Sequence, residues 1–284
     1  MTDQTQYPPP LVAPDSPRPT LRGWWLTAGL IGINLLVFVF ASLSGVDPLS
    51  PDNLSLLTLG ANFAPLTATG EPWRLLSSMF IHIGVLHLVI NLWALYIFGS
   101  YAEFYFGRRF YAVLYLLSGL MGSIATTWWN LAAAEAMLGS VAPTQLPAIS
   151  AGASGAIMGL GGALLIAAWR PRADLPVSAR LNLRMLITLM LINLAIGIVI
   201  PNIDNAVHLG GAVAGGLLAW LFTFSHQTRP AQQSVYIAIR WAGVLLFTAT
   251  LYYLKQQIEL RGVALEPLGQ QIRLELNQPR LSGE

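Results

Sequence analysis

Long apolar stretches separated by polar links are the feature that most constrains what this chain can fold into. Seven follow one another, near residues 24–43, 85–100, 110–130, 152–169, 183–200, 207–224 and 235–254. About 20 apolar residues in a helix cross the hydrocarbon core of a bilayer. A lone strand in lipid would leave its backbone groups unpaired, so each stretch is predicted to be a helix. We therefore expect an all-α, polytopic membrane bundle.

The composition agrees with this prediction and excludes several kinds of chemistry. Of the 284 residues, 55% are hydrophobic and only 10% are charged, whereas a soluble domain carries roughly 25% charged residues. The formal net charge of +2 gives no reason to expect a nucleic-acid partner. The chain has no cysteine, which excludes disulfides, thiolate catalysis and cysteine-ligated metals.

Four segments of different composition are expected. Residues 1–22 form a proline-rich leader that should be disordered. A signal peptide is the alternative, but the apolar run after the leader exceeds the roughly 7–15 residues of a signal sequence. Residues 23–225 are predicted to form a six-helix membrane core and 235–254 a seventh membrane helix. Residues 255–284 make a polar tail, in which the alternating pattern of 271–276 suggests a short strand.

Basic residues predict the orientation in the membrane, because arginine and lysine are in excess on the cytoplasmic side. With a cytoplasmic N-terminus, the only basic residue in the outer loops between spans is Arg74. Ten arginines then lie inside: Arg18, Arg22, Arg108, Arg109, Arg170, Arg172, Arg180, Arg184, Arg229 and Arg240. We expect an integral protein of the bacterial inner (plasma) membrane, with an extracytoplasmic C-terminus. The two long links, 44–81 and 131–150, would face outward.

Ser154 and His208 are the candidate reactive pair. Each lies near the start of an apolar stretch that, in this orientation, enters the membrane from outside. Polar side chains are costly in hydrocarbon unless they have partners or line a wet cavity, so such residues indicate a functional site. A hydroxyl beside an imidazole that can take its proton suggests nucleophilic catalysis.

Glycines accompany both residues. Gly155 and Gly159 follow Ser154, and Gly211 and Gly215 follow His208. Small residues four apart let two membrane helices approach closely. Glycine is common in membrane helices, so either pair alone is weak evidence. Two such pairs, each beside a reactive residue, favour direct packing of the two helices.

A third polar group lies upstream, at His82, His87 and Asn91. The last two are four residues apart and share one helix face. Both can donate hydrogen bonds, so this face could stabilise an oxyanion together with backbone N–H groups at the start of the Ser154 helix. Zinc binding is an alternative, but the His-Glu-x-x-His pattern is absent. For His82 alone, we favour a structural role as a buried polar group.

Together these motifs resemble the rhomboid family of intramembrane serine proteases. The residues fall in the family's order across positions 73–216, the whole six-helix core. The matching residues are Trp73, Arg74, His82, His87, Asn91, Glu103, Gly107, Gly152, Ala153, Ser154, Gly155, His208, Gly211 and Gly215. One departure is Val207, where many members have alanine. The seventh stretch resembles an extra C-terminal helix found in some members.

The resemblance implies a catalytic dyad, with Ser154 as nucleophile and His208 as base. It also implies an oxyanion hole made by His87, Asn91 and the backbone N–H of Ser154. The supporting residues would be His82, Gly152, Gly155, Gly211, Gly215, Trp73 and Arg74. Substrates would be transmembrane segments of other proteins, entering from the bilayer past residues 183–200 and 201–206. No metal, nucleotide or small-molecule cofactor is implied.

Two other functions and one other mechanism are alternatives. A small transporter would also explain polar groups within the membrane, but no internal repeat is visible and no ionisable residue lies mid-span. A catalytically inactive rhomboid-like membrane chaperone is disfavoured because Ser154 and His208 are both present. Asp204 and Asn205 lie within one turn of His208 and suggest a triad. We interpret Asp204 instead as an outer-loop carboxylate or helix cap, since the resemblance implies a dyad.

Overall fold

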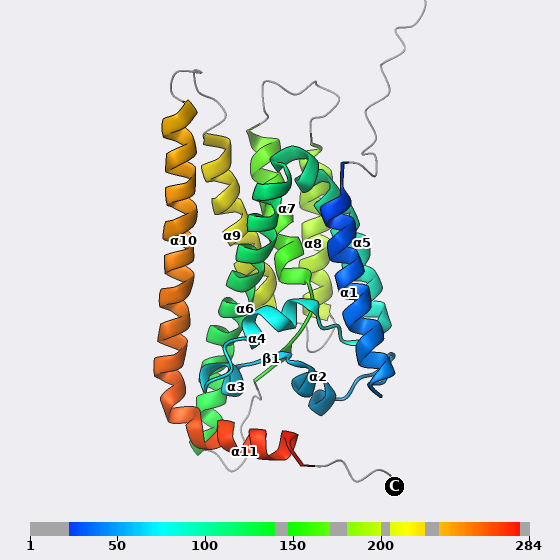
Figure 1. The fold of residues 1–284 in the computed structure, drawn as a ribbon, viewed down its shortest axis with the longest axis vertical. Helices are drawn as coiled ribbons and strands as arrows, with labels where there is room; N and C mark the ends of the chain where they lie inside the picture. Colours follow the sequence, from blue (N-terminus) through cyan, green and yellow to red (C-terminus); the bar gives the residue numbers. More distant parts are fainter. Residues whose placement is uncertain (1–22, 140–146, 171–180, 200–204, 225–232, 279–284) are drawn as a thin grey trace, which may run out of the picture.

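Each apolar stretch is a helix in the computed structural model, which describes residues 23–139, 147–170, 181–199, 205–224 and 233–278. The helices stand side by side in one bundle (Figure 1). They are α1 (Trp25–Leu43), α5 (Gly84–Phe106), α6 (Arg108–Gly139), α7 (Ser154–Trp169), α8 (Leu183–Val199), α9 (Asn205–Phe224) and α10 (Gln233–Gly262). The predicted all-α membrane bundle is confirmed. The proline-rich leader lies outside the described residues.

The helix that begins with Ser154 is short. Among the described helices, α1, α5, α6, α9 and α10 are long and apolar enough to span a membrane, whereas α7 and α8 are apolar but shorter. The 16 residues of α7 rise about 24 Å, less than the roughly 30 Å of a hydrocarbon core. In Figure 1, α7 begins part-way along the bundle. Its first residue is therefore recessed from one end of the bundle.

The core of the bundle is built around α7. Most of its side chains are buried, including Met158, Leu160 and Leu164, and it packs against α5, α6, α8 and α9. The helices at the two ends of the chain are peripheral. Only 17% of the apolar window of α1 and 11% of that of α10 are buried within the protein. The recessed start of α7 is thus surrounded by protein rather than by lipid.

The long first link is folded rather than extended. It contains α2 (Asn53–Leu59), β1 (Asn62–Phe63), α3 (Ala64–Ala68), α4 (Arg74–Ser77) and the 3₁₀ turn η1 (Ser78–Phe80). Strand β1 pairs antiparallel with β2 (Ile149–Ser150), Asn62 opposite Ser150 and Phe63 opposite Ile149. This two-stranded sheet joins the first loop to the segment that leads into Ser154.

The tail differs from the prediction, because residues 271–276 are helical and the expected strand is wrong. They belong to α11 (Glu266–Leu276), which follows α10 and the short turn η4 (Val263–Leu265). A proline in its first turn, Glu266 at its N-terminal end and Arg273 near its C-terminal end all favour a helix. A short strand would have needed a partner strand, whereas a helix satisfies its own backbone. Helices α6 and α10 also extend beyond the predicted spans, to Gly139 and Gly262.

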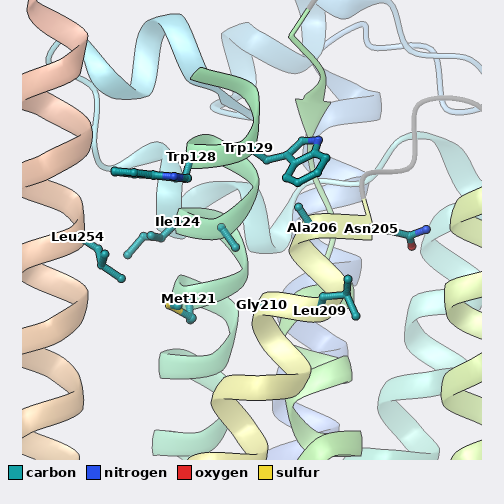
Figure 2. Close-up of a pocket in the computed structure, with 10 residues that line it drawn as sticks. Met121, Ile124, Trp128, Trp129, Asn205, Ala206, Leu209, Gly210 and Leu254 are labelled. Atoms are coloured by element: carbon teal, nitrogen blue, oxygen red, sulfur yellow. The ribbon is translucent and has the colours of Figure 1, made fainter. Parts of the chain in front are cut away.

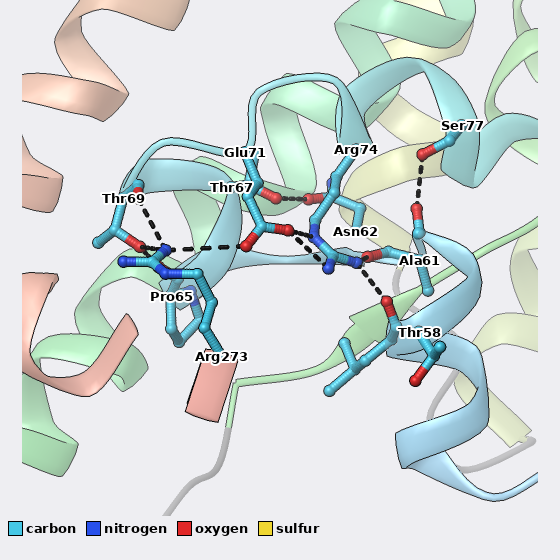
Figure 3. A network of polar contacts seen from close by, with 12 residues as sticks. Thr58, Ala61, Asn62, Pro65, Thr67, Thr69, Glu71, Arg74, Ser77 and Arg273 are labelled. Atoms are coloured by element: carbon cyan, nitrogen blue, oxygen red, sulfur yellow. Dashed lines mark hydrogen bonds and ion pairs between the residues drawn. The ribbon is translucent and has the colours of Figure 1, made fainter. Parts of the chain in front are cut away.

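A polar cluster connects α11 to the first loop (Figure 3). We call Thr69, Glu71, Arg74 and Arg273 the loop–tail clamp. Buried Arg74 bonds to the carbonyl oxygens of Leu57 (2.6 Å) and Ala61 (3.0 Å) and to Glu71 (2.7 Å). Arg273 bonds to the Thr69 carbonyl (2.9 Å) and lies 3.7 Å from the second carboxylate oxygen of Glu71. Glu71 is therefore shared by one arginine from the loop and one from the tail.

Candidate active site

The loop before Ser154 has a conformation that requires glycine. Gly152 has a φ of 126°, which side-chain-bearing residues rarely adopt. Its N–H donates to the Ser78 carbonyl at 2.9 Å, so this recessed backbone finds a partner inside the protein, as it must at membrane depth. A β-carbon at Gly152 would lie 2.7 Å from Cε1 of His87. The His87 ring therefore lies directly against the turn that presents Ser154.

Glycines bring the Ser154 helix and the His208 helix into backbone contact. A β-carbon at Gly211 would lie 2.0 Å from the carbonyl oxygen of Gly155, and one at Gly215 would lie 1.9 Å from that of Gly159. Gly155 is paired with Gly211, and Gly159, four residues later, is paired with Gly215, four residues later. Helices α7 and α9 therefore run in the same direction. Ser154 precedes the first contact by one residue and His208 by three. The two candidate residues therefore lie at the same level, at the start of both helices.

Helix α6 closes this interface from a third side. A β-carbon at Gly159 would lie 2.0 Å from Oγ of Ser118, and one at Gly122 would lie 2.7 Å from the carbonyl oxygen of Val207. The valine side chain itself fits between two glycines, with Cγ2 at 3.1 Å from a β-carbon at Gly122 and 2.9 Å from one at Gly155. The extra bulk of Val207 is thus accommodated by missing side chains on both neighbouring helices.

His87 and Asn91 form a hydrogen-bonded face of α5. The Ile83 N–H donates to Nδ1 of His87 at 3.2 Å, and the Asn91 amide donates to the His87 carbonyl at 2.9 Å. Because Nδ1 accepts, the proton of a neutral His87 ring lies on Nε2, the nitrogen 3.0 Å from a β-carbon at Gly152. Buried Oδ1 of Asn91 has no hydrogen-bond partner among the described residues. The face thus directs a ring donor toward the turn before Ser154.

His82 lies beside this face but outside the membrane helices. Its ring centroid is 5.4 Å from that of His87, and its Nδ1 lies 3.3 Å from the Phe80 carbonyl oxygen. Burial, and to a smaller extent the nearby His87, lower the pKa of His82 to about 3. The ring is therefore neutral at physiological pH. In the described part of the chain, no group of three or more His, Cys, Asp or Glu residues is placed to hold a metal ion.

Asn205 contacts His208; the sequence placed it within one turn of that histidine but assigned it no separate role. Oδ1 of Asn205 lies 3.1 Å from Nδ1 of His208, which is buried on the first turn of α9. Their spacing of three residues puts both side chains on one helix face, the signal by which the pair could have been found. Asp204, the carboxylate weighed as a triad member, lies outside the described residues.

An apolar groove of about 790 Å³ lies between α6, α9 and α10 (Figure 2). Trp128 and Trp129 of α6 line it together with Leu254 of α10 and Leu209 of α9. Ser154 and His208 are not among its lining residues, whereas Asn205 is. Among the described residues, Asn205 both lines this groove and contacts His208.

These features define a polytopic helical membrane protein whose polar site is recessed among three glycine-rich helices. The sequence pattern of the Rhomboid domain matches residues 69–225, more than half of the chain. The chain belongs to the rhomboid family, and it is an integral membrane protein.

Among the similar proteins, some are named as proteases and one is named as inactive. The chain is 35% identical to Rhomboid protease GluP of Bacillus subtilis (strain 168) over 185 residues, 65% of this chain and 32% of that protein. It is 28% identical to Rhomboid protease AarA of Providencia stuartii over 80% of this chain and 82% of that protein. It is also 36% identical to Inactive RHOMBOID-like protein 8 of Arabidopsis thaliana, over 68% of this chain and 50% of that protein. Family membership alone therefore does not decide whether the chain is catalytic.

Proposed function

We propose that this chain is an intramembrane serine protease that hydrolyses peptide bonds in or near the transmembrane segments of other proteins. The observation that carries the proposal is the backbone contact between Gly155 and Gly211. It puts a serine and a histidine at one level of a recessed, protein-lined site. The similarity to two proteins named rhomboid proteases supports the same reaction.

In the proposed mechanism, Ser154 and His208 act as a dyad. Oγ of Ser154 attacks the carbonyl carbon of the scissile bond while His208 takes the hydroxyl proton. His208 then gives that proton to the leaving amine, which departs and leaves an acyl-enzyme. Water, deprotonated by the same imidazole, attacks the ester carbonyl; the C–Oγ bond breaks, and His208 returns the proton to Oγ, which releases the second product as an acid and regenerates the serine.

The oxyanion of the tetrahedral intermediate would be stabilised from two sides. The first residue of α7 is Ser154 itself, so its N–H is one of the donors at a helix N-terminus that have no partner within the helix. From the other side, His87 offers its Nε2 proton, and Asn91 has one amide hydrogen beyond that given to the His87 carbonyl. Donors fixed before the reaction begins need no reorganisation when charge develops.

Substrates would reach this site from the bilayer, past α8. Of the side chains described on α8, only Leu186 and Met190 are buried, so most of this helix faces outward. The excess of arginine in the segments predicted to be inside supports an outer-side position for the start of α7 and α9. By the same rule, the N-terminus would lie in the cytoplasm and the C-terminal helix α11 outside.

The direct test is cleavage of a generic transmembrane substrate in detergent by wild type beside Ser154→Ala. We expect the wild type to cleave and Ser154→Ala to be inactive, with both proteins melting at the same temperature. Undiminished turnover by Ser154→Ala would contradict a serine mechanism. A folded wild type that cleaves nothing and does not react with a fluorophosphonate probe would indicate the inactive, chaperone-like alternative.

The oxyanion assignment makes a graded prediction. Asn91→Ala should lower kcat by about 10²–10³, the usual effect of removing one oxyanion donor, and His87→Ala should have a similar effect. Neither should abolish activity, because the other side chain and the Ser154 N–H remain. Full activity in both single variants and in the double variant would assign this face a purely structural role.

A further inference from the structure

Asn205 contacts two different elements with the two ends of its amide. Its Nδ2 lies 3.3 Å from the backbone carbonyl oxygen of Leu194 on α8, and its Oδ1 lies 3.1 Å from Nδ1 of His208. A backbone carbonyl only accepts hydrogen bonds, so the NH₂ end must face Leu194. This contact fixes the orientation of the amide, and the end facing His208 is the acceptor.

An acceptor at this position determines the tautomer of the histidine. To bond to Oδ1 of Asn205, Nδ1 of His208 must carry a proton. In a neutral ring, Nε2 is then unprotonated and can accept a proton. A general base needs this form, and orientation of the imidazole through its other nitrogen is what the third member of a triad provides.

The same amide packs tightly against α8. A β-carbon at Gly197 would lie 2.2 Å from Oδ1 of Asn205 and 2.9 Å from its Cγ. Only the missing side chain at Gly197 lets the amide lie between His208 and the last turn of α8. The position of α8 therefore decides whether Asn205 can hold its orientation.

We propose that Asn205 is a positioning residue that orients His208 as the base and couples this orientation to the seating of α8. The inference rests on the proposed function, in which His208 is the base and substrates enter past α8. When α8 moves aside, the Leu194 carbonyl leaves the amide and the histidine loses its fixed orientation. The base is then fully competent only when α8 is in place.

The test compares two variants that disturb the amide in different ways. Asn205→Leu removes both hydrogen bonds with little change in size. Gly197→Ala keeps Asn205 but displaces its amide. Each should lower kcat on a transmembrane substrate by about 10- to 100-fold, the range measured for partners that orient metal-bound histidines. We expect KM to stay within about twofold of the wild-type value, because no contact to substrate is removed.

Matched controls separate positioning from general packing. Asn193→Leu makes the same substitution at an α8 asparagine whose hydrogen bond among the described residues stays within its own helix, at the Leu189 carbonyl. Gly216→Ala adds a β-carbon on the His208 helix with no neighbour nearer than 3.8 Å. Both should retain wild-type kcat. Asn205→Asp keeps the acceptor toward His208 and should recover most of the activity lost in Asn205→Leu.

A spectroscopic readout is independent of turnover. The protein has four histidines, so ¹⁵N-histidine labelling, with His208→Ala for assignment, identifies the His208 signals. In wild type they should show protonated Nδ1 and unprotonated Nε2, and in Asn205→Leu a mixture of tautomers. Wild-type kcat and unchanged His208 signals in Asn205→Leu would overturn the inference. Failure of the proposed function would look different, because wild type itself would then not cleave or react with a fluorophosphonate.

Discussion

Two regions of this molecule are held together by opposite physical means. The α7–α9 interface beside Ser154 and His208 uses glycine against backbone, with no charged side chain at its contacts. The loop–tail clamp uses arginines, a shared carboxylate and backbone carbonyls. Lipid tails are as apolar as leucine, so within a membrane close packing must replace the hydrophobic effect. Outside it, charged groups can bridge separate segments, because water lowers the cost of leaving them partly exposed.

Because the two regions are held together differently, they should differ in how well they tolerate substitutions. A backbone contact has no side chain that can move away, so any added atom separates the helices. The partly exposed pairs of the clamp, those of Arg273, can rearrange and are screened by salt. We therefore expect the site to fail sharply when α7–α9 is altered and gradually when the clamp is altered.

The largest effect on activity is expected for Gly211→Val. Its β-carbon would lie 2.0 Å from the Gly155 carbonyl oxygen, so α9 must shift and carry His208 away from Ser154. Overpacking typically costs about 1–3 kcal/mol, occasionally more, and proton transfer needs the two side chains at roughly 2.6–3.2 Å. We expect lower thermal stability and loss of most activity, although no reactive group is removed.

The matched control for that variant is Gly32→Val on α1. A β-carbon at Gly32 meets nothing within 4 Å, so valine there should change melting and turnover little. The loop glycine Gly70 would be a poor control, because its φ of 109° strains any side-chain-bearing residue. A normal melting temperature and normal turnover in Gly211→Val would contradict the claim that the α7–α9 backbone contact holds the site together.

A smaller effect on activity, although a substantial loss of stability, is expected for Arg74→Ala. Arg74 is buried and satisfies the Leu57 and Ala61 carbonyls as well as Glu71. Removing one partner of a buried pair costs about 3–5 kcal/mol. Arg74→Lys should not restore the lost stability, because a single ammonium group cannot reproduce the several fixed donors of the guanidinium. Equal melting temperatures for wild type and Arg74→Ala would mean that the first loop does not depend on the clamp.

The smallest effect is expected for Arg273→Ala. Arg273 is partly exposed, and its pairs with Glu71 and Glu266 are of the kind worth about 0–1 kcal/mol. We expect a small loss of stability that shrinks further in 1 M salt, where the Debye length falls to about 3 Å. The Gly211→Val defect should not change with salt. A loss of stability in Arg273→Ala that does not depend on salt and is as large as that of Gly211→Val would contradict the expected difference between the two regions.

The sequence predicted those parts that depend on local pattern. Apolar runs located the membrane helices, and the spacing of Gly155, Gly159, Gly211 and Gly215 anticipated the close helix pair. The alternation of polar and apolar residues in 271–276 gave a wrong prediction of a strand. The same residues also fit a helix, which begins at Glu266 and packs on the first loop. The periodicity of a short polar segment does not reveal such a distant partner.

What could not be predicted are the contacts made between segments far apart in the sequence. Pairing of β1 with β2 and the His87 ring against Gly152 both depend on how separate elements meet. The bond from Asn205 to Leu194 has the same origin, since nothing in the local sequence indicates which α8 carbonyl faces it. The asparagine three residues before His208 was visible, but its role emerged only with α8 in place.

The central claim is that the α7–α9 contact holds Ser154 where His208 can activate it. The most direct measurement is the rate of fluorophosphonate labelling, with the modified residue located by mass spectrometry, in wild type, His208→Ala and Gly211→Val. We expect labelling of wild type at Ser154 alone, none in His208→Ala, and strongly slowed labelling in Gly211→Val. Labelling of Ser154 at the wild-type rate in either variant, or labelling of another residue in wild type, would contradict the claim.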